Sequence, residues 1–422
     1  METDEIGNSK VINHRWVILF LATLTQTTTA IVAQGVPTLG LFFQNEFQLS
    51  RSLVGMVVVS LNIGALFTLT LAGKAVDRFG ERKVVLLGGV LIGLLGMGMV
   101  FANYIYFLVL IIFLMGFGFA TATPGGSKAI RAWFPQEQRG LAMGIRQMGI
   151  PLGGTVAALL LPPIAVSFGW RVAMLTAGVF SVGGASLFFL FYKEQLTKNG
   201  NGREQEIKNS LPARHLLSNT SFLATSLLSL VLVVSQFSVV TYMILFLTEK
   251  LSYSLALSGS LLAAAQFSGA IGRIVLGLAS DKYFNGSRKK TLIIITLINA
   301  TICLLLAFMT GSLPYWLVAM AIIILGFASI GWNGLFVTLV TELVDETQSA
   351  TAVGLAMTFT QVGIIIGPPL FGLVIDVTDS YSVAWLLLSG MLWASIILFK
   401  FIKEPVIKKI KTKPGTANIY EK

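Results

Sequence analysis

Twelve stretches of this sequence are long and apolar enough to cross a lipid bilayer, and this feature constrains the fold more than any other. A helix needs roughly 20 apolar residues to span the ~30 Å hydrocarbon core. Only 12% of the residues are charged, whereas a soluble domain carries about 25%. The stretches cover residues 16–43, 52–73, 83–102, 105–131, 139–165, 170–192, 219–247, 255–280, 290–310, 314–341, 348–376 and 380–402. The sequence therefore predicts an all-α membrane protein with twelve transmembrane helices.

One long polar segment, 193–218, divides the twelve stretches into two groups of six. It is charged and rich in Gly and Asn, as linkers are. We expect an N-terminal six-helix bundle over 1–192, a cytoplasmic linker over 193–218, a C-terminal six-helix bundle over 219–403 and a basic cytoplasmic tail over 404–422. The first apolar stretch is too long for the apolar region of a signal peptide, so we expect it to be retained as a helix.

The basic residues are distributed unevenly between the loops on the two sides of the membrane. If the N-terminus is cytoplasmic, the outside loops hold only Arg51, Arg171 and Lys250, whereas the inside loops, the linker and the basic tail hold most of the other cations. Lys and Arg favour the cytoplasmic side, so the sequence predicts a multi-pass protein of the cell membrane with both termini in the cytoplasm. The net charge of +11 follows from this topology, and no nucleic-acid partner is expected.

The two groups of six are related in sequence. The run "GLAMGIRQMGIPLGG" begins at Gly140 and "GLAMTFTQVGIIIGP" begins at Gly354, an offset of 214 residues that places Gln147 over Gln361. A second pair, "GKAVDRFGERK" and "GLASDK", follows the second and the eighth stretch. Parallel repeats are expected of transporters in which two halves rock about a central site. The sequence thus predicts two pseudo-symmetric halves.

The first of these loops carries a motif that points to a family. The run G-K-A-V-D-R-F-G-E-R-K over 73–83 resembles the signature between helices 2 and 3 of the major facilitator superfamily, and its degenerate copy lies in the expected place in the second half. The resemblance covers nearly the whole chain and implies the major facilitator fold, without indicating a substrate. It also implies a gate that closes the cytoplasmic side, with simple anchoring by positive charge as the alternative. The gate residues are then Gly73, Asp77, Arg78, Gly80, Arg82, Asp281 and Lys282.

Two arginines lie inside apolar stretches. Arg146 lies in 139–165 and Arg273 in 255–280, whereas no Asp or Glu lies comparably deep in any stretch. At 1.5 Å per residue, each lies roughly 10–12 Å from the cytoplasmic end of its helix. A charge within the bilayer costs several kcal/mol and marks a candidate functional site. Because a guanidinium binds a carboxylate bidentately and stays charged, the two arginines predict a small anionic substrate.

Two patterns resemble organic-anion carriers of the superfamily. The run "GRIVLGLASD" around Arg273 resembles the helix-8 pattern of monocarboxylate and oxalate/formate-type porters, and "WFPQEQRGLAMGI" from Trp133 resembles organic-anion symporters. Helices 5 and 8 of the superfamily face one another across the two halves, so the resemblance implies that Arg146 and Arg273 can grip one anion. The expected function is secondary transport of a small anion by alternating access. An organic carboxylate fits best, and an inorganic anion such as nitrate stays open.

The charged candidates also have structural interpretations. Arg273 could satisfy a helix C-terminus or a backbone carbonyl, and Arg146 could snorkel to the interface or bind Asp77 or Glu342. Lys128 and Arg131 lie on one helix face near the cytoplasmic end of the fourth stretch. They could anchor the helix at the interface, pair with Asp77, or form an inner vestibule that attracts anions.

Uncharged polar residues within the apolar stretches either complete the predicted site or join helices by hydrogen bonds. The first stretch carries the unusually polar run "TQTTTAIVAQGVP". The resemblance implies that helices 1, 4, 7 and 10 line the cavity, which favours the candidates on the first and seventh stretches. The uncharged candidates for substrate binding are Gln26, Thr29, Gln147, Gln236, Tyr242, Gln266, Asn333 and Gln361.

A glycine-rich run, Gly149–Gly154, supports a second functional hypothesis. It resembles the span-5 signature of proton-driven exporters of drugs or metabolites, although exporters of cations place a carboxylate in the cavity and none is visible. The alternative interpretation is a device for close packing and kinking of helices. A non-transporting sensor built on a carrier fold is the third hypothesis.

The sequence indicates neither a catalytic centre nor a cofactor. It has no catalytic triad, no ATP-binding P-loop and no cluster of metal ligands, so we expect a monomeric transporter driven by a gradient. Proton coupling lacks an obvious carrier without a buried acid. The substrate could bring the proton, a second anion could be exchanged, or Glu249 or Glu342 near the span ends could titrate.

Overall fold

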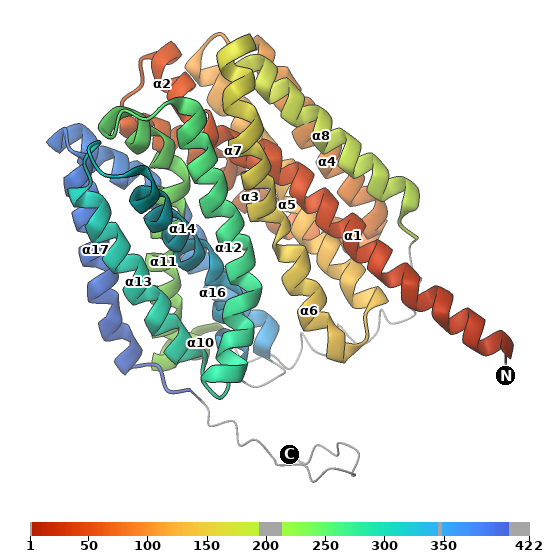
Figure 1. The fold of residues 1–422 in the computed structure, drawn as a ribbon. Helices are drawn as coiled ribbons and strands as arrows, with labels where there is room; N and C mark the ends of the chain where they lie inside the picture. The colour runs from red at the N-terminus through yellow and green to blue at the C-terminus, as the bar shows by residue number, and fades with distance from the viewer. Residues whose placement is uncertain (1, 194–212, 345–347, 405–422) are drawn as a thin grey trace.

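The computed structural model describes residues 2–193, 213–344 and 348–404. In this part of the chain, twelve helices are long and apolar enough to span a membrane, and no strand is assigned. Figure 1 shows the helices of the first half, in red to yellow, beside those of the second half, in green to blue. The predicted fold class, an all-α membrane protein of two six-helix halves, is confirmed. The limits given above for the linker and the tail stay predictions.

The first half contains six membrane spans, of which one is divided. Its elements are α1 (Glu2–Thr38), α2 (Gly40–Phe47), α3 (Arg51–Phe79), α4 (Glu81–Gly98), a 3-10 turn (Met99–Phe101), α5 (Ile105–Trp133), α6 (Gln136–Gln147), α7 (Gly149–Phe168) and α8 (Trp170–Phe191). The helices α6 and α7 together form the fifth span, and α2 is a short helix between the first two spans. The chain breaks the fifth span at Met148, which keeps a right-handed helical backbone.

The second half repeats this arrangement with a break in a different span. Its elements are α10 (Ala213–Ser218), α11 (Thr220–Leu245) with a π turn (Phe246–Lys250), α12 (Leu255–Tyr283), α13 (Arg288–Phe308), α14 (Tyr315–Gly331), α15 (Asn333–Glu342), α16 (Ser349–Thr378) and α17 (Tyr381–Ser395) with a 3-10 turn (Ile396–Lys400). The tenth span is divided at Trp332 into α14 and α15. Kinking at Gly149–Gly154 was one interpretation of the sequence in the fifth span, whereas the break at Trp332 was not predicted.

Polar residues and glycines set the ends of several helices. The hydroxyls of Ser50, Ser254 and Ser287 accept hydrogen bonds from backbone N–H groups in the first turns of α3, α12 and α13, which would otherwise lack acceptors. Gly80 ends α3 and precedes α4 with a φ of 84°. Only glycine adopts this backbone conformation without strain. The local backbone therefore explains why a glycine occupies this position of the predicted gate motif.

The two halves meet mainly through two helix pairs, α3 with α16 and α7 with α12. We call the side with the loops after α3 and α12 the terminal face, and the side with the loops after α1 and α11 the far face. Toward the far face, a Cβ on Gly55 of α3 would lie 2.8 Å from the carbonyl of Pro368 in α16. Toward the terminal face, a Cβ on Gly73 of α3 or Gly354 of α16 would meet no described atom within 4 Å.

The pair α7 and α12 follows the same trend. Near the far face, a Cβ on Gly259 of α12 would lie 2.6 Å from the carbonyl oxygen of Ala158 in α7. Near the terminal face, a Cβ on Gly277 of α12 would meet no described atom within 4 Å, and the same holds for Gly144 in α6. The described parts of the two halves are therefore in close contact at the far face and less so toward the terminal face.

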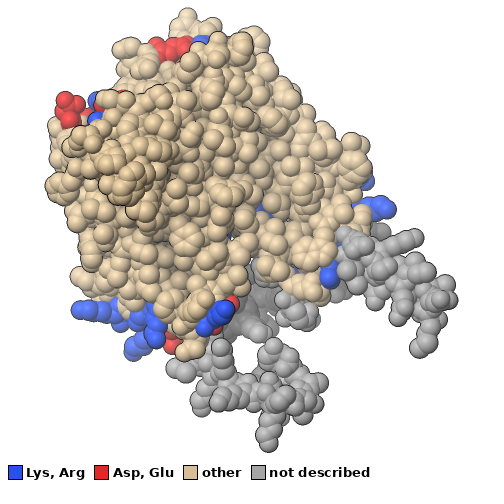
Figure 2. Space-filling model, in the orientation of Figure 1, with Lys and Arg blue, Asp and Glu red and all other residues tan. Residues whose placement is uncertain are grey.

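Charged side chains lie mostly on the terminal face. Figure 2 shows Lys and Arg along the lower edge of the molecule, which is this face in the shared orientation, and acidic groups at the upper edge. This distribution follows the positive-inside tendency. The assignment of the terminal face to the cytoplasm stays a prediction.

Candidate functional site

Arg146 lies in the last turn of α6 and is buried, with 1% of its surface exposed. Its Nη1 donates to Oε1 of Gln26 in α1 at 2.8 Å, and its Nη2 donates to Oγ of Ser127 in α5 at 3.1 Å. Gly126 leaves room for the guanidinium, since a Cβ there would lie 3.0 Å from Nη1. Arg146 is thus held inside the first half by neutral partners, and the interpretation that it snorkels to the interface is wrong for this state.

Arg273 lies within α12 and joins the two halves. Its Nη1 donates to the backbone carbonyl of Gln147 at 2.7 Å, in the first half, and its Nε donates to the carbonyl of Ile330 at 3.4 Å, in its own half. The carbonyl of Gln147 lies in the last turn of α6, and that of Ile330 lies in the last turn of α14. At the C-terminal end of a helix, the helix dipole concentrates partial negative charge. In this state, the contacts of Arg273 therefore match its structural interpretation, in which the arginine donates to backbone carbonyls.

The two arginines approach the break between α6 and α7 from opposite sides. Arg146 precedes Gln147 in the chain, and Arg273 binds the carbonyl of Gln147. The ion pairs found in the described part of the chain involve other cations, so neither arginine is neutralised by a described carboxylate. A buried guanidinium with neutral partners keeps the capacity to form charge-assisted hydrogen bonds with an anion.

Gln236 and Asn333 belong to the same cluster as Arg273. Oε1 of Gln236 in α11 accepts hydrogen bonds from Nε1 of Trp332 at 3.0 Å and from Nδ2 of Asn333 at 3.1 Å. Asn333 Nδ2 also donates to the carbonyl of Ile330 at 3.4 Å, the acceptor that Arg273 uses. Five of the predicted candidates thus surround the two helix breaks: Gln26, Arg146, Gln236, Arg273 and Asn333.

Other predicted residues lie elsewhere or have their polar groups engaged. Thr29 is buried, and its hydroxyl donates within α1 to the carbonyls of Thr25 and Gln26. Gln266 lies against α7, with its Nε2 only 2.4 Å from the position of a Cβ on Gly154. Gln147 contributes its backbone carbonyl, and its side chain and that of Gln361 are half-buried. In this state these side chains do not join the cluster at the helix breaks by a described hydrogen bond.

Tyr242 lies at the far face, where it belongs to a set of contacts that we call the far-face latch. The latch consists of Arg51, Tyr242, Glu249, Asp376 and Tyr381. The Tyr242 hydroxyl lies 2.7 Å from the carbonyl oxygen of Arg51 and 2.8 Å from that of Pro368, and its single proton can serve either. Arg51 Nη2 donates to Glu249 Oε2 at 2.9 Å, and the Tyr381 hydroxyl donates to the same oxygen at 2.8 Å. The latch joins the halves at the side where they are closest.

The gate motif of the first half ties helix ends together. Lys128 Nζ donates to the carbonyl of Val76 at 2.9 Å and lies 3.4 Å from Glu81 Oε2. Glu81 is buried and accepts a hydrogen bond from the Tyr192 hydroxyl at 2.6 Å. Lys128 therefore pairs with Glu81, an acid that was not its predicted partner. The side chains of Asp77 and Arg131 lie outside the described residues.

Other motif residues hold the same loop or remain at the surface. Arg82 Nε donates to the carbonyl of Phe189 at 2.6 Å, which joins α4 to α8. Arg78 and Lys282 are exposed and each lies over the aromatic ring of the following residue. No described contact in this state crosses from these side chains to the other half.

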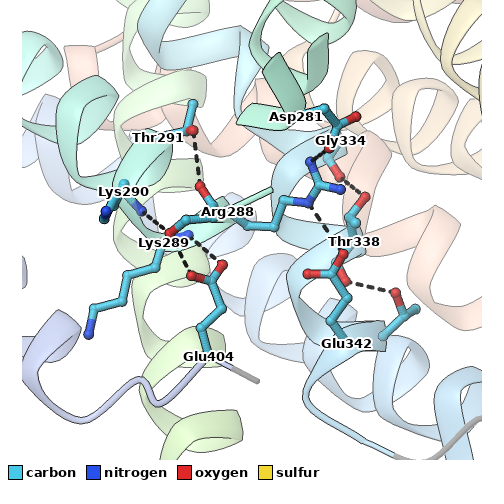
Figure 3. Close-up of polar contacts among 11 residues, drawn as sticks. Asp281, Arg288, Lys289, Lys290, Thr291, Gly334, Thr338, Glu342 and Glu404 are labelled. Carbon is cyan, nitrogen blue, oxygen red and sulfur yellow. Dashed lines mark hydrogen bonds and ion pairs between the residues drawn. The ribbon is translucent and has the colours of Figure 1, made fainter. Parts of the chain in front are cut away.

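The second half carries its own network at the terminal face. Figure 3 shows Arg288 at the start of α13 between Asp281 of α12 and Glu342 of α15. Its Nη1 pairs with Asp281, and its Nε donates to Glu342 Oε1 at 3.3 Å. Glu404 accepts a hydrogen bond from the backbone N–H of Lys289 at 2.9 Å. Glu342, a candidate proton carrier, is therefore held in an ion pair that spans three helices.

The glycines of Gly149–Gly154 serve close contacts between helices. A Cβ on Gly149 would lie 2.9 Å from the carbonyl oxygen of Thr23, and a Cβ on Gly153 would lie 2.5 Å from that of Thr27, both in α1. Together with Gly154 against Gln266, these contacts bring α7 against α1 and α12. They support the interpretation as a device for close packing. Within the residues searched, no group of three or more metal-ligating side chains is found.

In the described part of the chain, two six-helix halves meet around buried polar residues, an arrangement that is typical of membrane transporters. A family model described as Major Facilitator Superfamily matches residues 16–368 and 286–420. The match covers most of the sequence, and the chain belongs to this superfamily.

Several proteins resemble the chain along most of its length. An uncharacterised transporter of the same superfamily from Mycobacterium tuberculosis is 28% identical over 376 residues, covering 89% of this chain and 82% of that protein. A hexuronate transporter from Bacillus subtilis is 24% identical, covering 87% and 90% of the two chains. A probable sulfoacetate transporter from Cupriavidus necator is also 24% identical, covering 85% and 87%.

Solved structures show the same fold. A bacterial homolog of the human lysosomal transporter Spinster, in an inward-facing and occupied conformation, matches with a TM-score of 0.77 and 16% identity, covering 92% of this chain and 97% of that chain. A D-xylose-proton symporter matches with a TM-score of 0.72 and 19% identity, covering 92% and 97%.

Proposed function

We propose that this protein is a secondary transporter that moves a small organic anion across the cell membrane by alternating access. Arg273 binds the carboxylate of the substrate. The observation that carries the proposal is that Arg273 lies between the halves with two neutral carbonyls as its hydrogen-bond acceptors. The names of two relatives, a hexuronate transporter and a probable sulfoacetate transporter, denote small organic anions as well.

Substrate binding at Arg273 also provides a link to alternating access. A carboxylate forms stronger hydrogen bonds with a guanidinium than a neutral carbonyl does, so the substrate competes with Gln147 for Nη1. Because Gln147 belongs to the other half, loss of this bond changes the contact between the halves. A ligand shifts a conformational equilibrium only through such a difference between the two states.

Transport is driven by a gradient, either through protons or through exchange for a second anion. With both termini in the cytoplasm, the terminal face opens inward and the far-face latch closes the outside. The two acids considered as proton carriers, Glu249 and Glu342, are paired with Arg51 and Arg288. Either acid can accept a proton only by weakening its ion pair, which would couple protonation to contacts at the ends of the spans.

The experiment is uptake by the purified full-length protein in proteoliposomes, with D-galacturonate and sulfoacetate as probes. Arg273→Ala should lower uptake and apparent affinity at least about tenfold, because a charge-assisted bidentate contact is lost. Arg273→Lys keeps the charge without the planar fork and should recover only part of the loss. Arg171→Ala, which removes an arginine paired with Glu46 at the far face, is the matched control and should transport normally. Undiminished uptake and affinity in Arg273→Ala would refute the proposal.

A further inference from the structure

Gln26 carries an unused hydrogen-bond donor in the interior of the first half. Its side chain is 1% exposed, and its Nε2 has no hydrogen-bond partner in the described part of the chain. Its Oε1 is occupied by Nη1 of Arg146. A buried amide donor is normally paired, so this group indicates a missing acceptor, and the arginine beside it also has an unpaired Nε.

The orientation of the amide follows from its partner. A guanidinium can only donate hydrogen bonds, so it must face the oxygen of Gln26 and leave the NH2 group on the other side. Gln236 in the second half is held in the same way, because the indole of Trp332 also can only donate and binds its Oε1. The Nε2 of Gln236 makes no hydrogen bond within the described residues. Two glutamines, one from each half, therefore have engaged oxygens and unengaged NH2 groups.

We propose that Gln26 and Gln236 bind uncharged oxygen atoms of the substrate as a matched pair of amide donors, and that Arg146 positions Gln26. This inference rests on the proposed function. Arg146 is then a positioning residue, because its two polar contacts are with Gln26 and Ser127, and Arg273 provides the charge for the substrate. The expectation that the two arginines grip one anion is replaced by a division between a charged and a neutral subsite.

This division defines a substrate class. One guanidinium at the interface suits a single carboxylate, and NH2 groups without a formal charge suit hydroxyl or carbonyl oxygens. The site is therefore suited to a hydroxylated or oxo monocarboxylate. A dicarboxylate would be preferred if Arg146 bound a second negative charge directly.

Three probes of equal carbon number separate these possibilities. D-galacturonate has one carboxylate and several hydroxyls, hexanoate has one carboxylate without hydroxyls, and adipate has two carboxylates without hydroxyls. Competition for uptake in proteoliposomes gives their relative affinities. We expect D-galacturonate to bind at least about tenfold more tightly than hexanoate and adipate, since each buried hydrogen bond contributes up to about tenfold. A preference for adipate, or no preference, would overturn the inference.

Variants that exchange the amide donor for an acceptor test the residues themselves. Gln26→Glu keeps an oxygen for Arg146 but removes the NH2 group, so the preference for D-galacturonate over hexanoate should fall about tenfold. Gln236→Glu should have the same effect and serves as a second test if Gln26→Glu does not fold. Arg146→Lys keeps a donor toward Gln26 and should preserve more of this preference than Arg146→Met.

The control is Gln48→Glu, the same exchange at an exposed position of the far face, which should keep the wild-type preference. If both buried variants keep the preference while Arg273→Ala abolishes anion binding, this inference fails and the proposed function stands. If Arg273→Ala has no effect, the proposed function fails first. The ratio of affinities is measured on protein that still transports, so a purely structural defect does not imitate the result.

Discussion

Asp376 of the second half caps a helix of the first half through Arg51. Its Oδ1 accepts a hydrogen bond of 2.8 Å from the backbone N–H of Arg51, and its Oδ2 accepts one of 2.8 Å from the N–H of Ser52. These are the first two residues of α3, whose N–H groups have no acceptor within the helix. The carboxylate also meets the positive end of the helix dipole. The closed far face is thus held by a helix cap that crosses between the halves.

Asp376→Asn should open the far face more often. The amide keeps one acceptor oxygen and turns an NH2 group toward a second N–H donor, so the cap loses about 1–2 kcal/mol. Because 1.4 kcal/mol corresponds to a factor of ten, we expect about a tenfold higher ratio of open to closed molecules. Spin labels at Gln48 and Ser252, which are exposed at the far face in different halves, report the distance. Asp379→Asn is the control, and an unchanged distance distribution in Asp376→Asn would count against the latch.

Gly55→Ala should impair closure of the far face. The new Cβ would lie 2.7 Å from the Tyr242 hydroxyl and 2.8 Å from the backbone of Pro368, and backbone atoms cannot move aside cheaply. We expect uptake to fall about tenfold, for a cost of about 1–3 kcal/mol in the closed state. Gly183→Ala, where no described atom lies within 4 Å, should transport normally. Equal uptake by both variants would show that the contact between α3 and α16 is not required.

Glu46→Gln should remove a pH-dependent part of stability at the far face. Burial by itself raises the pKa of Glu46, but hydrogen bonds from Arg171 and Trp170 and the charge of Arg171 outweigh it, so the pKa is lowered. A lowered folded-state pKa stabilises the protein above the unfolded value of 4.5, and this contribution disappears as the pH falls through the folded value. For a partly exposed pair we expect about 0.5–1 kcal/mol at pH 7. Thermal unfolding of both proteins should differ at pH 7, and the difference should shrink as the pH falls below 4.5. A difference that does not change with pH contradicts the assignment.

Arg288→Ala should destabilise the second half. Glu342 and Asp281 lose their shared partner, and we expect about 2 kcal/mol of destabilisation because Arg288 and Glu342 are largely buried. Cys303 is fully buried and is the single cysteine of the chain, so a thiol-reactive fluorophore reports unfolding during a thermal ramp. Lys290→Ala, on the exposed side of the same helix, should unfold at the wild-type temperature. Arg288→Ala combined with Glu342→Gln should recover part of the loss, and a fully additive loss would exclude the ion pair.

Much of the fold could be predicted because its causes are local in the sequence. Runs of apolar residues define the spans, and the polar segment between the sixth and the seventh span separates the halves. The gate motif was placed in the loop after the second span, and Gly80 of this motif, which follows the end of α3, has a positive φ. The break at Met148 adjoins the run Gly149–Gly154, for which kinking was one interpretation of the sequence. The break at Trp332 was not predicted, because no Pro marks it and single glycines occur throughout the apolar stretches.

The candidate site was predicted in part for the same reason. An arginine within an apolar stretch stands out in the sequence because a charge within the bilayer costs several kcal/mol. Arg146 and Arg273 could therefore be selected without a structure. The orientation of the glutamine amides could not, because it depends on donors from other helices. The ion pair of Lys128 with Glu81 was missed because Glu81 lies at a helix end. In the sequence, an acid at such a position cannot be distinguished from a solvent-exposed acid in a loop.

By itself, the sequence determined that this chain forms twelve membrane helices in two related halves and places two arginines within apolar stretches that hold no comparably deep acid. These properties follow from the free energy of transferring each residue from water to lipid. That free energy is set by the residue itself and changes little with the rest of the fold. The tertiary structure alone decided which groups these arginines bind and which face is closed. The partners Arg51 and Asp376 are 325 residues apart, and no local pattern joins residues at that distance. Hydrogen bonds are short and directional, so they are specified only when the packed helices bring donor and acceptor together.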